Sequence, residues 1–286
     1  MAESFRPGSH WIFLVVLLCW MTDTACEAAD KVSGILTVED ALTLPNQAVR
    51  IEAKLAGKNL AGSPAMGGIS LQLHIDDKPV ATAKTNEAGL AFFEYTPKMR
   101  GTNVIGVSIN DSPSVEAVKA DATLFVWERR RPILVVELAA LIQPNVSSSS
   151  GSASSAAAPS VQPVPDAAEE LTRLTQYYYN LVYVPGGDQS QMELLRSGGV
   201  RRWLEFHKFP IGLVPTPAYG GLSAILDTFK QEGWTTIKTG IGRTRMFADA
   251  LLQHRMEVLI VPEPPKGELP RKAKAAKDWK EVRKKL

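Results

Sequence analysis

Cysteine is nearly absent from this chain of 286 residues, and both copies, Cys19 and Cys26, lie near the N-terminus. The remainder of the chain therefore has no residues for disulfides, thiolate metal sites or a cysteine nucleophile. Charge of one sign is also lacking, because 32 Lys and Arg stand against 30 Asp and Glu, for a net charge of +2. This balance gives no indication of a nucleic-acid partner.

Long hydrophobic runs are missing as well. The apolar run from Trp11 to Met21 is only about eleven residues, which is short for a membrane span. Arg6 precedes this run and the small-residue stretch 25–29 follows it, a pattern typical of a secretory signal peptide. We therefore predict a signal peptide over residues 1–28, a secreted or periplasmic protein, and no stable membrane span after cleavage. The alternative is a protein that residues 11–21 anchor in the membrane.

Alternating apolar and polar residues follow the N-terminal segment. Segments with this alternation are separated by turn signals rich in Gly, Pro, Asn and Asp. Short strands with regular turns over about a hundred residues predict an all-β sandwich covering residues 32–127. The alternating segments are 48–55, 69–75 and 90–95, and the turns are 76–79, 86–89 and 97–101.

Part of this sandwich resembles bacterial immunoglobulin-like domains. In those domains a loop ending in Gly leads into a strand, a Pro follows, and a second Gly precedes the last hairpin. Gly89, Pro97 and Gly101 occupy these places in the chain. The resemblance implies an immunoglobulin-like sandwich of the kind that serves as a spacer or adhesion module.

A different pattern begins at Arg131. The unbroken apolar run from Ile133 to Val136 is followed by a single acidic residue, Glu137. This pattern predicts a central strand of a parallel sheet, buried on both faces, with a carboxylate at its carboxyl end. Open α/β sheets bind their ligands at that end of their strands.

The segment 144–165 interrupts this second part of the chain. It is rich in Ser, Ala and Pro and has no apolar periodicity. Such a segment buries too little apolar surface to offset the entropy lost on ordering, so we predict a disordered insertion. Because the first strand of the sheet precedes it, the insertion lies within one α/β domain that covers residues 131–286.

This α/β part resembles the haloacid dehalogenase (HAD) phosphohydrolases, in which an apolar strand ends in Asp-x-Asp-Gly-Thr. Glu137 takes the place of the nucleophile and Ala139 that of the acid/base residue. The run from Trp203 to Pro210 is similar to the Trp-Leu-x-x-His-x-Phe-Pro motif of lipin-type and actin-patch phosphatidate phosphatases. The resemblance implies a three-layer, Rossmann-type α/β domain with a parallel sheet.

Other positions of the family pattern have changed too. Pro185 stands where a Ser or Thr holds the phosphoryl group, and no Lys begins the helix that follows Gly220. Arg243 replaces the magnesium-binding Asp, and Phe247 occupies the place of a second acidic residue. The resemblance therefore implies no metal site and no cofactor.

Two functions follow from this comparison. The favoured one is a catalytically inactive pseudophosphatase that binds an unknown protein or an anionic ligand, or acts as a scaffold. The alternative is a phosphohydrolase with an atypical active site, for which Mg²⁺ would be required. For the inactive protein we predict a charge pair between Arg243 and Glu137, or else an anion site formed by Gly186, Gly187, Arg243 and Arg245.

Overall fold

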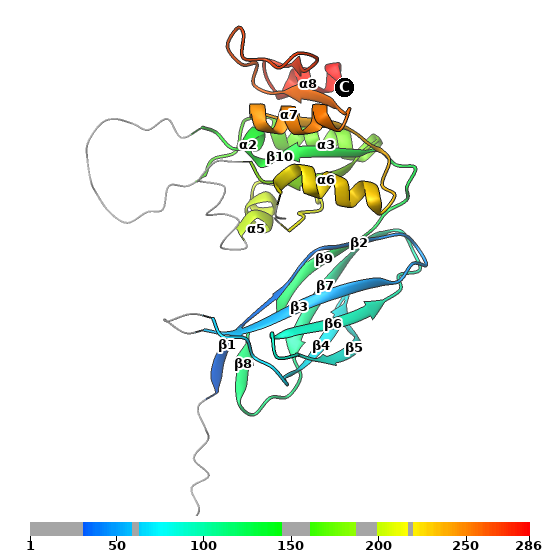
Figure 1. Cartoon of the computed structure of the whole chain (residues 1–286), viewed down its shortest axis with the longest axis vertical. Coiled ribbons are helices and arrows are strands. Elements are labelled where there is room, and N and C mark those ends of the chain that lie inside the picture. The colour runs from blue at the N-terminus through cyan, green and yellow to red at the C-terminus, as the bar shows by residue number, and fades with distance from the viewer. Residues whose placement is uncertain (1–30, 59–62, 145–160, 187–198, 217–219) are drawn as a thin grey trace, which may run out of the picture.

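A computed structural model describes residues 31–58, 63–144, 161–186, 199–216 and 220–286 of the chain. The predicted signal peptide, most of the predicted insertion and Gly187 lie outside these residues. The described chain forms a β-sandwich and an α/β part, one after the other (Figure 1). In the described part of the chain, no helix is both long enough and apolar enough to cross a membrane.

The β-sandwich consists of two sheets with strand orders β6-β3-β1-β8 and β2-β9-β7-β4-β5. Alternation produces its core: along β4, Leu71, Leu73 and Ile75 are buried, and the residues between them are not. The predicted sandwich is thus confirmed at the level of two packed sheets. The strands are β1 (Val32–Val38), β2 (Ala41–Thr43), β3 (Val49–Gly57), β4 (Ser70–Ile75), β5 (Lys78–Lys84), β6 (Leu90–Tyr95), β7 (Gly101–Ile109), β8 (Val115–Ala117) and β9 (Ala120–Val126).

The α/β part contains a five-stranded parallel sheet with the order β11-β10-β12-β13-β14. All five residues of β10 are buried, as the apolar run predicts. The order of the strands reverses at β10, so the carboxyl ends of β10 and β12 form the switch point of the sheet. The strands are β10 (Ile133–Glu137), β11 (Asn180–Val184), β12 (Ile237–Gly242), β13 (Glu257–Ile260) and β14 (Lys274–Ala275).

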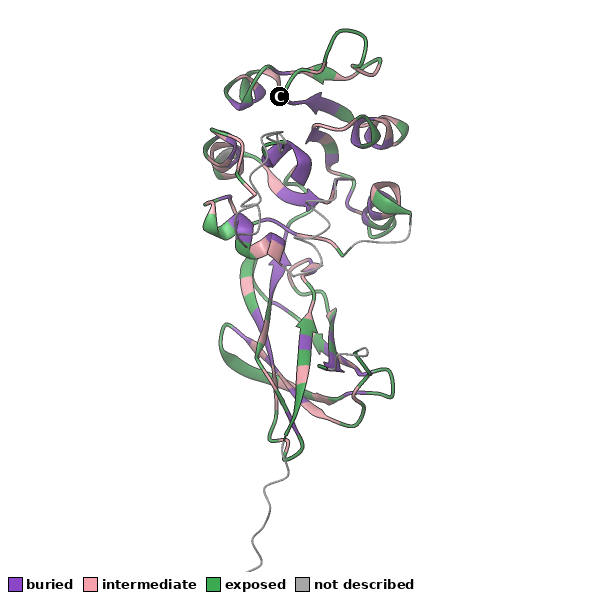
Figure 2. Cartoon of the chain, turned by 90° about the vertical axis from the view of Figure 1, so that its left-hand side faces the viewer, coloured by how far each residue is buried: buried purple, intermediate pink, exposed green. Residues whose placement is uncertain are grey.

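Helices pack against both faces of this sheet (Figure 2). Successive residues of β10 point to opposite sides, so both faces are apolar. Leu134 and Val136 belong to the core shared with α3, α5 and α8, whereas Ile133 and Val135 belong to the core shared with α6 and α7. Each face of the sheet therefore has its own apolar core. The helices are α2 (Leu138–Leu141), α3 (Ala167–Tyr177), α5 (Gly199–Phe206), α6 (Gly221–Gln231), α7 (Arg245–Gln253) and α8 (Trp279–Lys285).

The end of the segment predicted as a disordered insertion is ordered. The backbone N–H of Val164 donates to the Leu141 carbonyl at 2.7 Å, and the Trp203 indole donates to the Val161 carbonyl at 2.8 Å. These bonds fix residues 161–165 to the α/β part, so the prediction of disorder is wrong for them. Composition could not reveal this, because the partners lie elsewhere in the chain.

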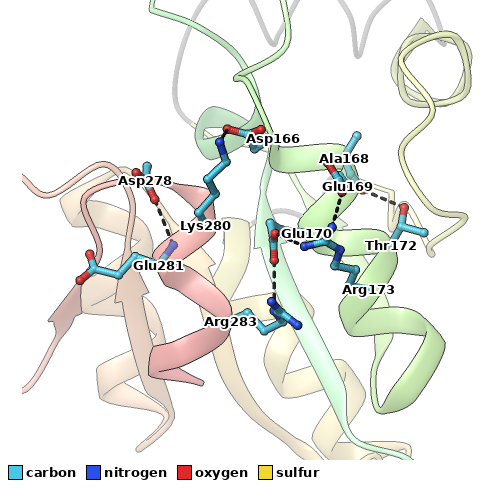
Figure 3. A network of polar contacts seen from close by, with 10 residues as sticks. All are labelled: Asp166, Ala168, Glu169, Glu170, Thr172, Arg173, Asp278, Lys280, Glu281 and Arg283. Carbon is cyan, nitrogen blue, oxygen red and sulfur yellow. Dashed lines mark hydrogen bonds and ion pairs between the residues drawn. The ribbon is translucent and has the colours of Figure 1, made fainter.

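Ion pairs join α3 to the C-terminal helix α8 (Figure 3). The buried carboxylate of Glu170 lies 2.8 Å from Arg173 Nη1 and 3.3 Å from Arg283 Nε, the latter contact lacking hydrogen-bond geometry. Asp166 precedes α3 with a φ of 63° and makes no side-chain cap. Its carboxylate instead lies 3.2 Å from Lys280 Nζ, so Asp166 links the two helices.

Candidate functional site

Glu137 lies at the carboxyl end of β10, at the switch point of the parallel sheet, and is 1% exposed. Its Oε2 accepts hydrogen bonds from the backbone N–H groups of Arg243 at 2.7 Å and Thr244 at 2.9 Å. Its Oε1 accepts a hydrogen bond from the Thr244 hydroxyl. Three donors from the loop between β12 and α7 therefore surround a carboxylate that is almost completely removed from water.

Thr244 connects this carboxylate to helix α7. As the N-cap residue, Thr244 accepts a hydrogen bond from the backbone N–H of Phe247 at 3.2 Å with its hydroxyl oxygen. The same hydroxyl donates a hydrogen bond to Glu137. The N-terminus of a helix favours negative charge, so the position of the carboxylate is electrostatically suitable. Sequence reasoning missed Thr244, although a Thr just before an apolar-periodic segment is a recognised N-cap signal.

Arg243 reaches Glu137 through its backbone and not through its guanidinium. Its Nη1 donates to the Ile142 carbonyl at 2.7 Å. Among the described residues, its side chain forms no ion pair with Glu137 within 4.0 Å. The prediction of a direct charge pair between Arg243 and Glu137 is therefore wrong, because the guanidinium donates to the Ile142 carbonyl at the end of α2. The positive charge of Arg243 is still near enough to favour the ionised carboxylate of Glu137.

Burial raises the pKa of Glu137 above its ordinary value of 4.5. The hydrogen bonds from Thr244 and Arg243 and the charge of Arg243 oppose this rise without cancelling it. Desolvation disfavours the charged carboxylate, whereas donors favour it, so the shift reflects a partly compensated burial.

Other residues that the HAD resemblance singles out are buried or partly buried. Ala139 is buried in α2, and Pro185 is partly buried just after β11. Phe247 is buried against β12, where a Cβ added at Gly242 would lie 2.2 Å from its ring. The Phe247 ring therefore requires glycine at position 242.

The residues predicted to bind an anion are only partly assembled. Gly186 is buried just after β11, and Gly187 lies outside the described residues. The Arg245 side chain is 72% exposed, and its Nε lies 3.6 Å from Asp249 in the same helix. The backbone donors of Arg243 and Thr244 already bind Glu137. The anion site stays a prediction.

Among the described residues, no group of three or more His, Cys, Asp or Glu side chains is placed to hold a metal ion. A cavity of about 520 Å³ lies away from Glu137, between the β-sandwich and the α/β part. Its walls include Asp40 and Arg50 from the β-sandwich and Glu232 and Trp234 from the α/β part.

No protein-family model matches the chain, and no curated protein matches it. Among solved structures, it is similar to the fibronectin(III)-like modules of CbhA from Clostridium thermocellum, with 14% identity and a TM-score of 0.23, over 32% of this chain and 94% of that one. The D0-D1 domain of intimin is 17% identical with a TM-score of 0.23, over 32% and 46% of the two chains. A sialyltransferase from Photobacterium damsela is 8% identical with a TM-score of 0.21, over 80% and 42%. These scores are too low to establish a family for the chain.

Proposed function

We propose that this chain is an exported, non-catalytic binding or scaffold protein, in which an immunoglobulin-like sandwich precedes a degenerate HAD-like domain. The observation that carries the proposal is the state of Glu137. Covalent catalysis by a carboxylate requires an oxygen free to attack the substrate. In this chain Oε2 accepts two backbone N–H groups and Oε1 accepts a hydroxyl, in a side chain that is 1% exposed.

The surroundings of Glu137 support the same proposal. An anion bound at the switch point of an α/β sheet commonly receives backbone N–H groups at the start of a helix. In this chain the carboxylate of Glu137 accepts the N–H groups that precede α7, so it occupies the place of such an anion. Glu137 thereby joins the carboxyl end of β10 to the start of α7, which is a structural role.

A phosphatase assay combined with calorimetry tests this proposal. The secreted protein is incubated with p-nitrophenyl phosphate and Mg²⁺, and it is titrated separately with Mg²⁺, phosphate and vanadate. We expect no turnover and no heat of Mg²⁺ binding. Mg²⁺-dependent turnover that Glu137→Ala abolishes, and that Glu263→Ala retains, would establish Glu137 as a nucleophile. Glu263 is a suitable control because it is exposed.

The binding role is tested on the two parts of the molecule by substitution in the full chain. A ligand found for the protein is measured against variants of the exposed strand β5 and of the exposed end of α5. Loss of binding in one set places the ligand on that part. Unchanged binding in both sets would count against a binding surface on either of them.

A further inference from the structure

Asp40 lies between β1 and β2, at the boundary of the β-sandwich and the α/β part. Its side chain is 5% exposed. Its Oδ1 accepts the backbone N–H of Thr123 in β9 at 2.9 Å, within the sandwich. Its Oδ2 accepts the backbone N–H of Val214 at 3.1 Å and pairs with Arg201 of α5, both in the α/β part. Oδ1 therefore binds the β-sandwich, and Oδ2 binds the α/β part.

These contacts would be costly to lose. Separation of the two parts would leave the Val214 N–H without its acceptor and the Arg201 guanidinium without its carboxylate. Burial raises the pKa of Asp40, and Arg201 and the backbone donors oppose that rise. An ion pair between the buried Asp40 and the partly exposed Arg201 contributes little net stability relative to apolar packing, but it forms only in a narrow range of geometries. Its main consequence is therefore orientation.

A second set of contacts lies where the chain passes from one part to the other. The Trp127 and Trp234 rings meet edge to face, with centroids 6.2 Å apart. Arg129 Nη2 donates to the Glu232 carbonyl at 3.1 Å. The cavity of about 520 Å³ is lined both by Asp40 and by Arg129 and Trp234, so it lies between the two sets of contacts. Two separated attachments define an orientation that a linker alone leaves free.

We propose that Asp40 is an interdomain clamp, which holds the β-sandwich and the α/β part in one fixed orientation through Arg201 and Val214 and keeps the cavity between them formed. The device is conformational and independent of the state of Glu137. It predicts that the molecule moves as one body, to which the apolar core that Phe125 and Trp127 share with the α/β part also contributes.

Pulsed electron–electron resonance between two spin labels measures this orientation in the full chain. The labels are attached to Glu87→Cys in the sandwich and Lys284→Cys in α8, both exposed, after the native Cys19 and Cys26 are replaced by Ser. We expect a single narrow distance distribution. With Asp40→Ala the distribution should broaden and its mean should shift, because Val214 and Arg201 lose their common partner.

Matched substitutions distinguish the clamp from general destabilisation. Arg202→Ala changes the exposed neighbour of Arg201, which lies outside the clamp and the cavity, and should leave the distribution as it is. Arg201→Gln should broaden it, and this variant decides the outcome if Asp40→Ala does not fold. The clamp is refuted if Asp40→Ala or Arg201→Gln folds and gives the distribution of the unsubstituted chain. A broad distribution in the unsubstituted chain would refute it equally.

Discussion

Thr244 holds both oxygens of the Glu137 carboxylate: its hydroxyl donates to Oε1, and its backbone N–H donates to Oε2 at 2.9 Å. The two residues are 107 positions apart in the chain. Their contact joins the carboxyl end of the strand β10 to the N-cap of α7.

Glu137→Gln should destabilise the protein by about 2 to 4 kcal/mol, because an amide nitrogen cannot accept the N–H and O–H donors that now surround the carboxylate. Chemical denaturation followed by circular dichroism measures the loss. Glu263→Gln is the control, since this exposed side chain has no buried donors to satisfy. Equal stability of the two variants would show that Glu137 has no structural role.

Thr244→Val should cost about 1 to 2 kcal/mol, because it removes both the hydroxyl donor to Glu137 and the acceptor for the Phe247 N–H. Thr244→Ser keeps the hydroxyl and should retain most of the stability. The midpoint of urea denaturation compares the three proteins. A Val variant as stable as the unsubstituted chain would contradict a stabilising role of the hydroxyl.

The raised pKa of Glu137 predicts a pH dependence of stability. Native Glu137 binds a proton more readily than the unfolded chain, whose Glu titrates near 4.5, so its contribution to the free energy of unfolding falls as pH rises above that value. The fall is complete once the pH exceeds the raised pKa. Denaturation of the unsubstituted chain and of Glu137→Gln should show their stability difference narrowing over this window.

The opposite trend would mean that the donors outweigh burial. In that case the stability difference between the unsubstituted chain and Glu137→Gln would widen as the pH rises towards 4.5 and would persist above it. Such a result would overturn the direction of the shift and strengthen the assignment of Thr244 and Arg243 as donors to an ionised carboxylate.

Arg283→Ala should destabilise the attachment of α8 to α3 by about 1 to 2 kcal/mol, since Glu170 is buried and would keep only Arg173 as its ion-pair partner. Hydrogen exchange of α8 amides should accelerate. Lys284→Ala changes the adjacent, exposed residue and is the matched control. Equal exchange in both variants would show that the Glu170 pair does not hold α8.

Several features of the fold could be predicted because they depend on local patterns. The alternation of Leu71, Leu73 and Ile75 predicts a half-buried strand, and the run from Ile133 to Val136 predicts a strand buried on both faces. Strand β14 could not be predicted, because its two residues are too few for any periodicity. The absence of a side-chain cap at Asp166 could not be predicted either, because its carboxylate pairs with Lys280 of a distant helix.

For the candidate site, the location could be predicted from the sequence and the contacts could not. Its location was predictable, since parallel strands place their carboxyl ends together and Glu137 ends the interior strand β10. Its contacts were not, because the choice between a guanidinium and a backbone N–H depends on where the loop before α7 runs. The Arg243 guanidinium donates to the Ile142 carbonyl, and the Arg243 backbone N–H donates to the Glu137 carboxylate.

By itself, the sequence determined the two kinds of sheet and their order along the chain, because periodicity is a local property. Only the tertiary structure decided the roles of Glu137 and Asp40. Each is a single carboxylate whose donors lie more than 80 residues away, at 106 positions for Arg243 and 83 for Thr123. A buried charge is defined by the partners that folding brings to it, and no local pattern encodes them.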